Sequence, residues 1–479
     1  MPVLEALRPI FSILPEVPKP KRTVSFREKL LWTTIVLTIY LVFTEVPLYP
    51  LAKVSNAQNY NPLFSIIFAT RFGTLAHLGV GPIVTAGLIM QLLVGSKIIN
   101  LDLTDKSHRA LYTGTQKFLA IVFTLFESIV FIASGLLPVS NLAQAVLIIL
   151  QLFFVGIIII LMDELLQKGW GFGSGISLFI LTGVALQVFS SLFSPIAVAP
   201  DQFFGLIPNI ILVASGGGNF WYLLLGNPNF ASSPSILGLI SMIVVLILLV
   251  YLQSVKVEIP VAYPKYGGVK AKIPLQLLYV SNVPVILAAA LVANLLFVTQ
   301  LIWSRYNING TNPILSALGY FKYVQSGTSS TPVPAGGLIY YLTPPQNFYQ
   351  AMLDPVRAIV YVIIFSLLCI LFSYAWVETS GMNAEEQAKK MVSSGLQVPG
   401  FRQSNLVMAS ILKRYIPTLT WFSGLLVGLL ASVSDIFGVI GTGIGLLLAI
   451  GIIYQYYMIL VQQRLEEEFP SIARFLEGK

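Results

Sequence analysis

Ten apolar stretches, separated by shorter polar connections, dominate this sequence. A helix needs about 20 apolar residues to cross a bilayer, and the chain is 56% hydrophobic but only 10% charged. Soluble domains carry roughly a quarter charged residues. The stretches lie near 30–48, 80–95, 118–137, 142–162, 173–193, 236–255, 275–303, 356–377, 416–434 and 439–461. They predict an all-α polytopic protein with ten membrane spans in one integral domain.

The stretch 61–95 departs from this pattern, because a first apolar piece ends after about ten residues and a second one begins. The first piece, 62–72, is too short to cross a bilayer, and the second starts among Gly79, Gly81 and Pro82. Non-helical backbone at membrane depth must be buried in protein or line a wet cavity. The break therefore predicts a pore or a binding site.

Lysine and arginine positions predict the orientation, because positive residues are retained on the cytoplasmic side of short loops. With the N-terminus inside, 23 of the 28 basic residues fall on the cytoplasmic side. We expect both termini to be cytoplasmic. The 29 residues before the first span include several charges and no small-residue cleavage site follows, so we expect no removable signal peptide. The lone Cys369 gives no disulfide framework.

Two halves of five spans would start from opposite sides of the membrane, which makes inverted pseudo-symmetry possible. No convincing repeat between the halves is visible, and inverted repeats with a broken helix are also typical of ion-coupled transporters of small solutes. That function remains an alternative. The expected division is a cytoplasmic segment 1–29, an N-terminal half 30–193 with a short plug at 61–72, an external hinge loop 194–235, a C-terminal half 236–462 and a cytoplasmic tail 463–479.

Motifs of enzyme chemistry are missing from the sequence. There is no phosphate-binding loop, no HExxH and no Cys/His cluster with metal spacing, so we expect no catalysis, no cofactor and no metal. The run GWGFGSG at 169–175 is interpreted as a close backbone approach. A transporter would place charged residues deep in its spans. Glu127 fits either interpretation, whereas Asp163, Glu164 and Asp435 are expected at the membrane interface.

Two cytoplasmic connections concentrate positive charge around turn residues. They could be solvated loops that obey the positive-inside rule, or they could contact phosphate-rich RNA, for which isolated lysines and arginines suffice. The charge pattern alone leaves both hypotheses open. The residues are Lys256, Lys265, Lys270 and Lys272 in the sixth connection, and Arg402, Lys413 and Arg414 in the eighth.

Several long motifs in order are similar to the SecY family of protein-translocation channels, in its archaeal and eukaryotic-like form. The resemblance covers about residues 20–465, and the outer connections 194–235 and 304–353 look longer than the family requires. The motifs are TLAHLGVGPIVTAGLIMQLLVGS, GFGSGISLFI, VEIPVAYPKYGG, LLYVSNVPVILAAALVAN, VETSG and PGFRQSNLVMASILKRYIP.

The resemblance implies an hourglass pore between the halves, closed by an aliphatic ring and a plug, with a lateral gate between spans two and three and spans seven and eight. The apolar pattern alone would make each ring residue an ordinary packing or lipid-facing residue. In the implied ring, Leu447 could take the place of Leu448. The implied ring is Val80, Val84, Ile176, Ile180, Ile286 and Leu448. The implied plug includes Pro62, Leu63, Phe64, Ile66, Ile67, Thr70 and Arg71. The implied gate residues are Thr85, Gln91, Glu127, Ser281 and Asn282.

The resemblance also implies partners, because the chain encodes no motor. Unfolded secretory chains would cross the pore, and hydrophobic signal segments would leave sideways into the lipid bilayer. Small subunits of the SecE and Secβ/SecG type are expected, in an archaeal plasma membrane rather than the endoplasmic reticulum. A membrane insertase without an aqueous pore is a third class. Asn309 lies in a glycosylation sequon. The residues implied to dock a ribosome or another motor are Lys265, Lys270, Arg402, Lys413 and Arg414.

Overall fold

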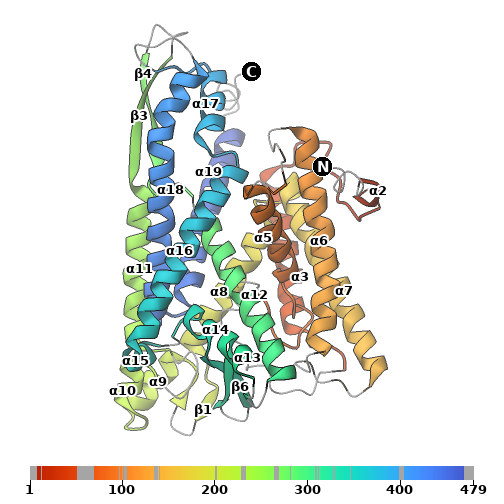
Figure 1. Cartoon of the computed structure of the whole chain (residues 1–479), viewed down its shortest axis with the longest axis vertical. Coiled ribbons are helices and arrows are strands. Elements are labelled where there is room, and N and C mark those ends of the chain that lie inside the picture. The colour runs from red at the N-terminus through yellow and green to blue at the C-terminus, as the bar shows by residue number, and fades with distance from the viewer. Residues whose placement is uncertain are drawn as a thin grey trace.

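A computed structural model of the chain shows a bundle of long helices with small elements at both ends (Figure 1). The structure describes residues 8–11, 13–50, 69–96, 98–99, 101, 105–133, 137, 139, 141–199, 202–227, 234–263, 269–280, 282–307, 310, 312–326, 329–345, 347–398 and 404–468.

Ten helices form the bundle within the described residues. Eight of them are long and apolar enough to cross a membrane. The other two are α3, which carries charges near its ends, and α5, which has 15 residues and continues the interrupted stretch. The prediction of ten membrane spans is confirmed. The helices are α3 (Phe26–Glu45), α5 (Gly81–Gly95), α6 (Lys106–Ala133), α7 (Leu142–Leu165), α8 (Gly175–Phe193), α11 (Ile236–Ser254), α12 (Val283–Tyr306), α16 (Pro355–Thr379), α18 (Asn405–Ile436) and α19 (Gly443–Glu468).

Shorter elements lie at the two ends of the bundle (Figure 1). We call the end with strands β3 and β4 the hairpin end and the end with β5 and β6 the opposite end. At or near the hairpin end are α2 (Arg8–Phe11), η2 (Leu166–Trp170), β3 (Lys256–Tyr263), β4 (Val269–Gln276) and α17 (Ala384–Ser393). At the opposite end are β1 (Ala197–Ala199), β2 (Gln202–Phe203), α9 (Leu206–Ala214), α10 (Phe220–Leu225), α13 (Pro313–Leu318), β5 (Tyr320–Ser326), β6 (Ser329–Gly336), α14 (Leu338–Leu342) and α15 (Phe348–Leu353).

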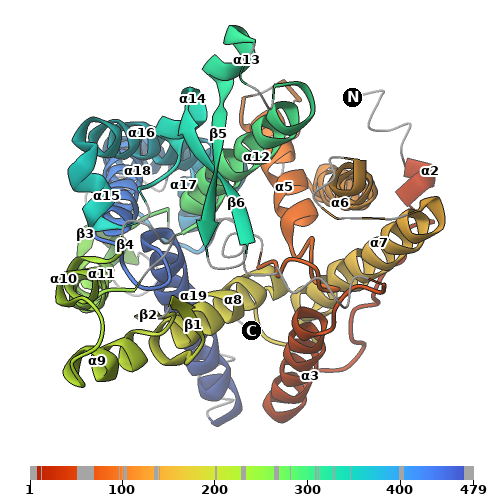
Figure 2. The same cartoon turned by 90° about the horizontal axis from the view of Figure 1, so that it is seen from below.

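The helices divide into two halves that lie side by side. Figure 2 shows α3, α5, α6 and α7 on one side and α11, α16 and α18 on the other, with α8 beside α19 near the middle. The seam where α5 packs on α12 and α16 joins the halves, and a second contact joins α8 to α19. Because each half has five helices, α3 and α11 begin at opposite ends of the bundle (Figure 1), as inverted symmetry requires.

One predicted span boundary needs correction, and two helices extend beyond their predicted spans. The predicted span 275–303 was wrong at its start, because Leu275 and Gln276 belong to β4, which pairs antiparallel with β3, and the helix begins only at Val283. Helix α18 begins at Asn405, ahead of the predicted span that starts near 416, and α6 begins at Lys106, ahead of the predicted span that starts near 118. Hydropathy finds only the apolar part of a helix, whereas these helices continue into polar sequence.

A second hydrophobic core explains the extension of α18. At the hairpin end, side chains of β3, β4, α17 and the first turns of α18 form a cluster of their own, which includes Val261, Ala388 and Leu412. Backbone hydrogen bonds between Ala262 and Gln397 close this unit. The C-terminal half therefore carries a small folded domain beyond its membrane helices.

Small residues bring the helices of the C-terminal half close together. Gly424 and Gly428 on α18 form a GxxxG pattern that faces α16. A Cβ on Gly428 would lie 2.8 Å from the Cα of Ser366. Such spacing lets helix backbones approach closely in a membrane, where association depends on packing rather than on the hydrophobic effect.

Candidate functional site

The candidate ring residues come from four helices of both halves. Val80 directly precedes α5, Val84 lies on α5, and Ile180 lies on α8. These three are buried in one continuous apolar cluster together with Leu448 of α19, while Ile176 and Ile286 are partly buried against it. The neighbouring Leu447 belongs to the same cluster. The structure thus brings the six residues into one apolar region, and their arrangement as a ring around a pore stays a prediction.

Most of the candidate plug, including Pro62, Leu63, Phe64, Ile66 and Ile67, lies outside the described residues. The described residues 69–72 form turns rather than helix. They are held on α3, because the Tyr40 hydroxyl donates to the carbonyl of Ala69 and Arg71 pairs with Glu45. Thr70, between them, has no regular secondary structure.

The residues after the candidate plug continue this attachment. The backbone N–H of Leu75 donates to Val46 at 2.9 Å, and that of Ala76 donates to Phe43 at 3.0 Å. Leu48 in turn donates to Gly73 at 2.9 Å. The C-terminal root of the candidate plug is therefore fastened to the end of α3.

Polar contacts cross the seam between the halves. Asn294 Nδ2 on α12 donates to Thr85 Oγ1 on α5 at 3.2 Å. Gln91 Nε2 on α5 donates to the hydroxyl of Thr379 on α16. A Cβ on Gly95 would lie 3.3 Å from the Cβ of Ala375, so the two helices touch closely. Such bonds average about 0.6 kcal/mol in a membrane protein, which suits a contact that must part.

A row of aromatic rings crosses the same seam. Phe72 lies 4.8 Å from His77, His77 lies 4.4 Å from Phe131 on α6, and Phe131 lies 4.7 Å from Phe297 on α12, measured between ring centroids. Aromatic pairs at these distances contribute beyond the area they bury. The row links the root of the candidate plug to both sides of the candidate gate.

The other predicted gate residues are placed differently. Asn282 Nδ2 donates to the carbonyl of Leu448 at 3.4 Å, so this bond joins α12 to α19 within the C-terminal half. Glu127 on α6 is partly buried. Ser281 lies outside the described residues.

The acidic residues expected at the interface have structural partners. Asp163 accepts from the backbone N–H of Ile176 at 3.0 Å and so holds the start of α8. Glu164 pairs with Lys117 at 2.7 Å and with Lys168 at 2.8 Å.

Asp435 lies at the end of α18 and joins it to its neighbours. It accepts from the Tyr361 hydroxyl at 2.8 Å and from the backbone N–H of Gly443 at 2.6 Å. These three acidic side chains tie helices together, and a role in ion coupling is not needed to explain them.

The basic residues of the hairpin end are described in part. Lys265 and Arg402 lie outside the described residues, and Lys270 lies in β4 opposite Ala262. Lys413 pairs with Glu385 of α17 at 2.8 Å, and Arg414 beside it is exposed.

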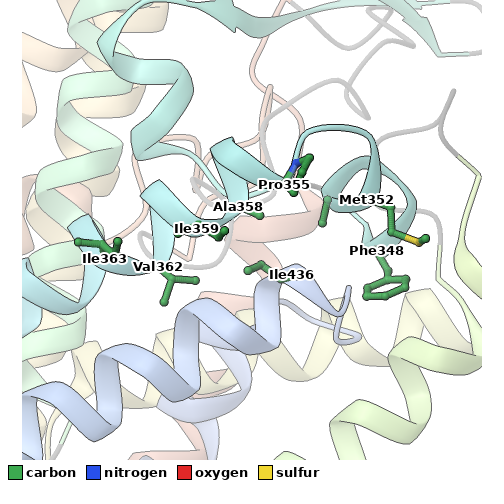
Figure 3. A pocket seen from close by; sticks show the side chains of 9 residues that line it. Phe348, Met352, Pro355, Ala358, Ile359, Val362, Ile363 and Ile436 are labelled. Carbon is green, nitrogen blue, oxygen red and sulfur yellow. The ribbon is translucent and has the colours of Figure 1, made fainter.

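An apolar cavity of about 430 Å³ lies apart from this site, between α15, α16 and the end of α18 (Figure 3). No charged side chain lines it, so it offers nothing to hold a polar solute in place. Its lining residues are Phe348, Ala351, Met352, Pro355, Ala358, Ile359, Val362, Ile363 and Ile436.

Sequence reasoning missed Asn294, Thr379 and the aromatic residues of the seam. Asn294 is a polar residue in the middle of a predicted span, which is a signal that could have been used. Phe131 and Phe297 are ordinary span residues, and nothing in the pattern distinguishes them.

Two helical halves of five, which meet at an apolar region and along a seam with polar contacts, define a polytopic helical membrane protein. The chain belongs to the SecY family, whose family model matches residues 74–457. It is 39% identical over 482 residues to protein translocase subunit SecY of Aeropyrum pernix, with 99% of each chain covered. It is 40% identical over 479 residues to the same subunit of Methanothermobacter thermautotrophicus, with 98% of each covered.

Solved structures agree with this assignment. A protein-conducting channel matches with a TM-score of 0.82 at 36% identity, covering 98% of this chain and 99% of the other. Sec61 from a canine ribosome-channel complex of the endoplasmic reticulum matches with a TM-score of 0.79 at 35% identity and the same coverage. The protein is therefore a multi-pass membrane subunit of a channel that conducts polypeptides, a non-enzymatic family, rather than a transporter of small solutes.

Proposed function

We propose that an unfolded polypeptide passes between the two halves through a ring formed by Val80, Val84, Ile176, Ile180, Ile286 and Leu448. The observation that carries this proposal is that these aliphatic side chains, from both halves, lie buried or partly buried in one apolar region. A narrow apolar constriction excludes water and ions by dewetting. Flexible aliphatic side chains can also move aside for a peptide of any sequence.

The segment 61–72 seals this ring from the opposite end. Its fastened root at Ala69 and Arg71 supports the proposal, because a plug must move without being lost. In a related SecY structure, with a TM-score of 0.79 at 35% identity and covering 98% of this chain and 99% of the other, the plug domain is described as stabilising the closed state and maintaining a membrane seal.

Deletion of residues 61–70 tests the seal. Membranes that hold the variant should leak ions at rest, whereas membranes with the parent channel should not. A deletion of the same length in the outer connection, residues 324–333 of the β5–β6 hairpin, is the control. Unchanged resting conductance in the first variant would contradict the plug assignment.

The seam of α5 and α6 with α12 and α16 serves as the lateral gate. The bonds of Thr85 and Gln91 across it support this role, because each is weak enough to break. A hydrophobic signal segment can then leave through the gate, since its transfer into lipid is favourable. Glu127, Ser281 and Asn282 complete the proposed gate.

The hairpin end faces the cytoplasm and docks the ribosome or another motor. The basic residues support this orientation through the positive-inside rule, and α2 and the end of α19 lie toward the same end. Sec61 and Ssh1 are described in ribosome-bound complexes, the latter with a TM-score of 0.76 at 25% identity, covering 96% of this chain and 94% of the other. Subunits of the SecE and Secβ/SecG type complete the channel, in an archaeal plasma membrane. The proposed docking residues are Lys265, Lys270, Arg402, Lys413 and Arg414.

Charge reversal tests the docking surface. Arg402→Glu combined with Arg414→Glu should weaken ribosome binding in a flotation assay, because phosphate contacts are lost. Lys322→Glu, in the β5–β6 hairpin at the other end of the molecule, is the matched control. If the double variant binds ribosomes as well as the Lys322→Glu control does, these loops are an ordinary solvated surface and do not dock the ribosome.

A further inference from the structure

Two short helices in the outer connection, α9 and α10, have no role in the channel described above. They lie between the ends of α8 and α11, at the rim of the bundle and at the opposite end (Figures 1 and 2). The chain from Gln202 to Leu225 contains no charged residue. An exposed connection in water would normally be polar.

One face of this pair is packed firmly on the channel. Leu206 and Leu223 form a buried cluster with Ile440. Asn209 accepts from and donates to the backbone of Phe203, each at 2.6 Å. A Cβ on Gly205 would lie 2.6 Å from the carbonyl oxygen of Ser194, so the chain turns tightly into α9. The two helices are thus fixed elements of the fold.

The other face is also apolar, but it is exposed. Ile211 on α9 is 65% exposed and Trp221 on α10 is 64% exposed, and Ile207, Ile210 and Phe220 are exposed beside them. A helix that is apolar on more than one face is normally buried on all of them. The second face must therefore be shielded from water by something outside this chain.

The surfaces of the neighbouring helices indicate what shields this face from water. On α8, Phe189 and Phe193 are exposed, and on α11 Ile240 is exposed. These are faces of membrane-spanning helices, and α9 packs on α8 while α10 packs on α11. The exposed apolar face therefore continues the lipid-facing surface of the bundle at the level where the helices end. Tryptophan is enriched at that level, because its ring is apolar while its N–H reaches water.

We propose that α9 and α10 lie in the lipid interface of the leaflet at the opposite end, with Ile211 and Trp221 immersed in lipid. They form a membrane-bound collar on the connection between the two halves. Interfacial helices of this kind are held by the apolar area that they bury in the boundary of the bilayer.

Site-directed spin labelling tests this proposal directly, because Cys369 is the one cysteine in the sequence and is buried. Ile211→Cys and Trp221→Cys are labelled with a nitroxide in the channel complex, reconstituted in lipid nanodiscs. Collision with oxygen, which concentrates in lipid, is compared with collision with a water-soluble nickel chelate. Ile247→Cys on the exposed face of α11 is the lipid control, and Lys322→Cys on β5 is the water control.

The proposal predicts that both labels resemble the lipid control, with oxygen collisions at least several-fold more frequent relative to nickel than at the water control. A ratio like that of the water control would overturn it. Exclusion of both reagents would also overturn it, because a protein partner or a second copy would then cover the face. The parent channel, treated with the same nitroxide reagent, shows whether Cys369 contributes any signal.

Discussion

Replacement of Phe131 by alanine should bias the channel toward its open state. Phe131 lies on α6, on the N-terminal side of the seam, and its ring is 4.7 Å from that of Phe297 on the C-terminal side. The side chain is only 4% exposed, so this contact lies inside the bundle. Opening of a lateral gate must separate the two rings.

The size of the effect follows from that one pair. An aromatic pair contributes about 0.5–1.5 kcal/mol beyond its buried area, and about 1.4 kcal/mol corresponds to a tenfold change in an equilibrium constant. The ratio of closed to open channels should therefore fall roughly 2- to 12-fold in the Phe131→Ala variant. The cavity left behind costs about 3–5 kcal/mol of overall stability, which thermal unfolding measures separately.

Single-channel recording of the empty complex in a planar bilayer is the assay. Phe126→Ala is the matched control, since Phe126 lies on the same helix but is 55% exposed. If Phe131 acts through Phe297, the double variant Phe131→Ala/Phe297→Ala should open no more often than the Phe131→Ala variant, because the same ring pair is lost in both. Equal open probabilities for Phe131→Ala and Phe126→Ala would refute this reasoning.

Three further predictions concern other contacts. Asn294→Leu removes the bond to Thr85 and should raise the open probability about threefold, whereas an unchanged value would exclude that bond from the gate. Gly428→Ala places a methyl group against the α16 backbone and should cost about 1–3 kcal/mol in thermal unfolding. Gly336→Ala should cost much less, because its Cβ would meet only the Cβ of Tyr320, at an ordinary contact distance of 3.6 Å. The hydrogen bond from Lys168 lowers the pKa of Glu16. This contact therefore stabilises the folded N-terminal segment fully above about pH 4.3, and the stabilisation is lost as the pH falls through the lowered pKa. Hydrogen exchange of residues 13–20, measured relative to the intrinsic exchange rate at each pH, should rise only in that acid range, and the Glu16→Gln variant should lack this rise.

Hydropathy was sufficient to predict the bundle, because each membrane helix must carry its own apolar sequence. The interrupted stretch was equally informative, since α5 starts where Gly81 and Pro82 predicted a new beginning. The start of α12 could not be predicted in this way, because Leu275 is apolar for a different reason, its burial in the core at the hairpin end.

The candidate site was predicted less completely. Thr85 and Gln91 were identified as gate residues, but their partners Asn294 and Thr379 were not. These partners are separated from them by more than 200 residues in the chain, and they depend on how each helix is rotated in the bundle. One sequence contains no information on such pairs beyond the polarity of each residue.

The structure of the outer connections could not be predicted from the sequence either. The hairpin of β5 and β6 and the helices α9 and α10 lie in segments that the sequence predicts only as long outer connections. Their structure depends on contacts such as that of Leu223 with Ile440, which lies more than 200 residues away.

Crosslinking of a stalled nascent chain tests the central claim most directly. A photoreactive residue at position 180 or 286 should crosslink to the chain in transit, because Ile180 and Ile286 are proposed to form the ring. The same probe in place of Ile247, on the exposed face of α11, should give little product with a soluble secretory substrate. Strong crosslinks from position 247 with none from positions 180 and 286 would contradict the proposed path of the polypeptide.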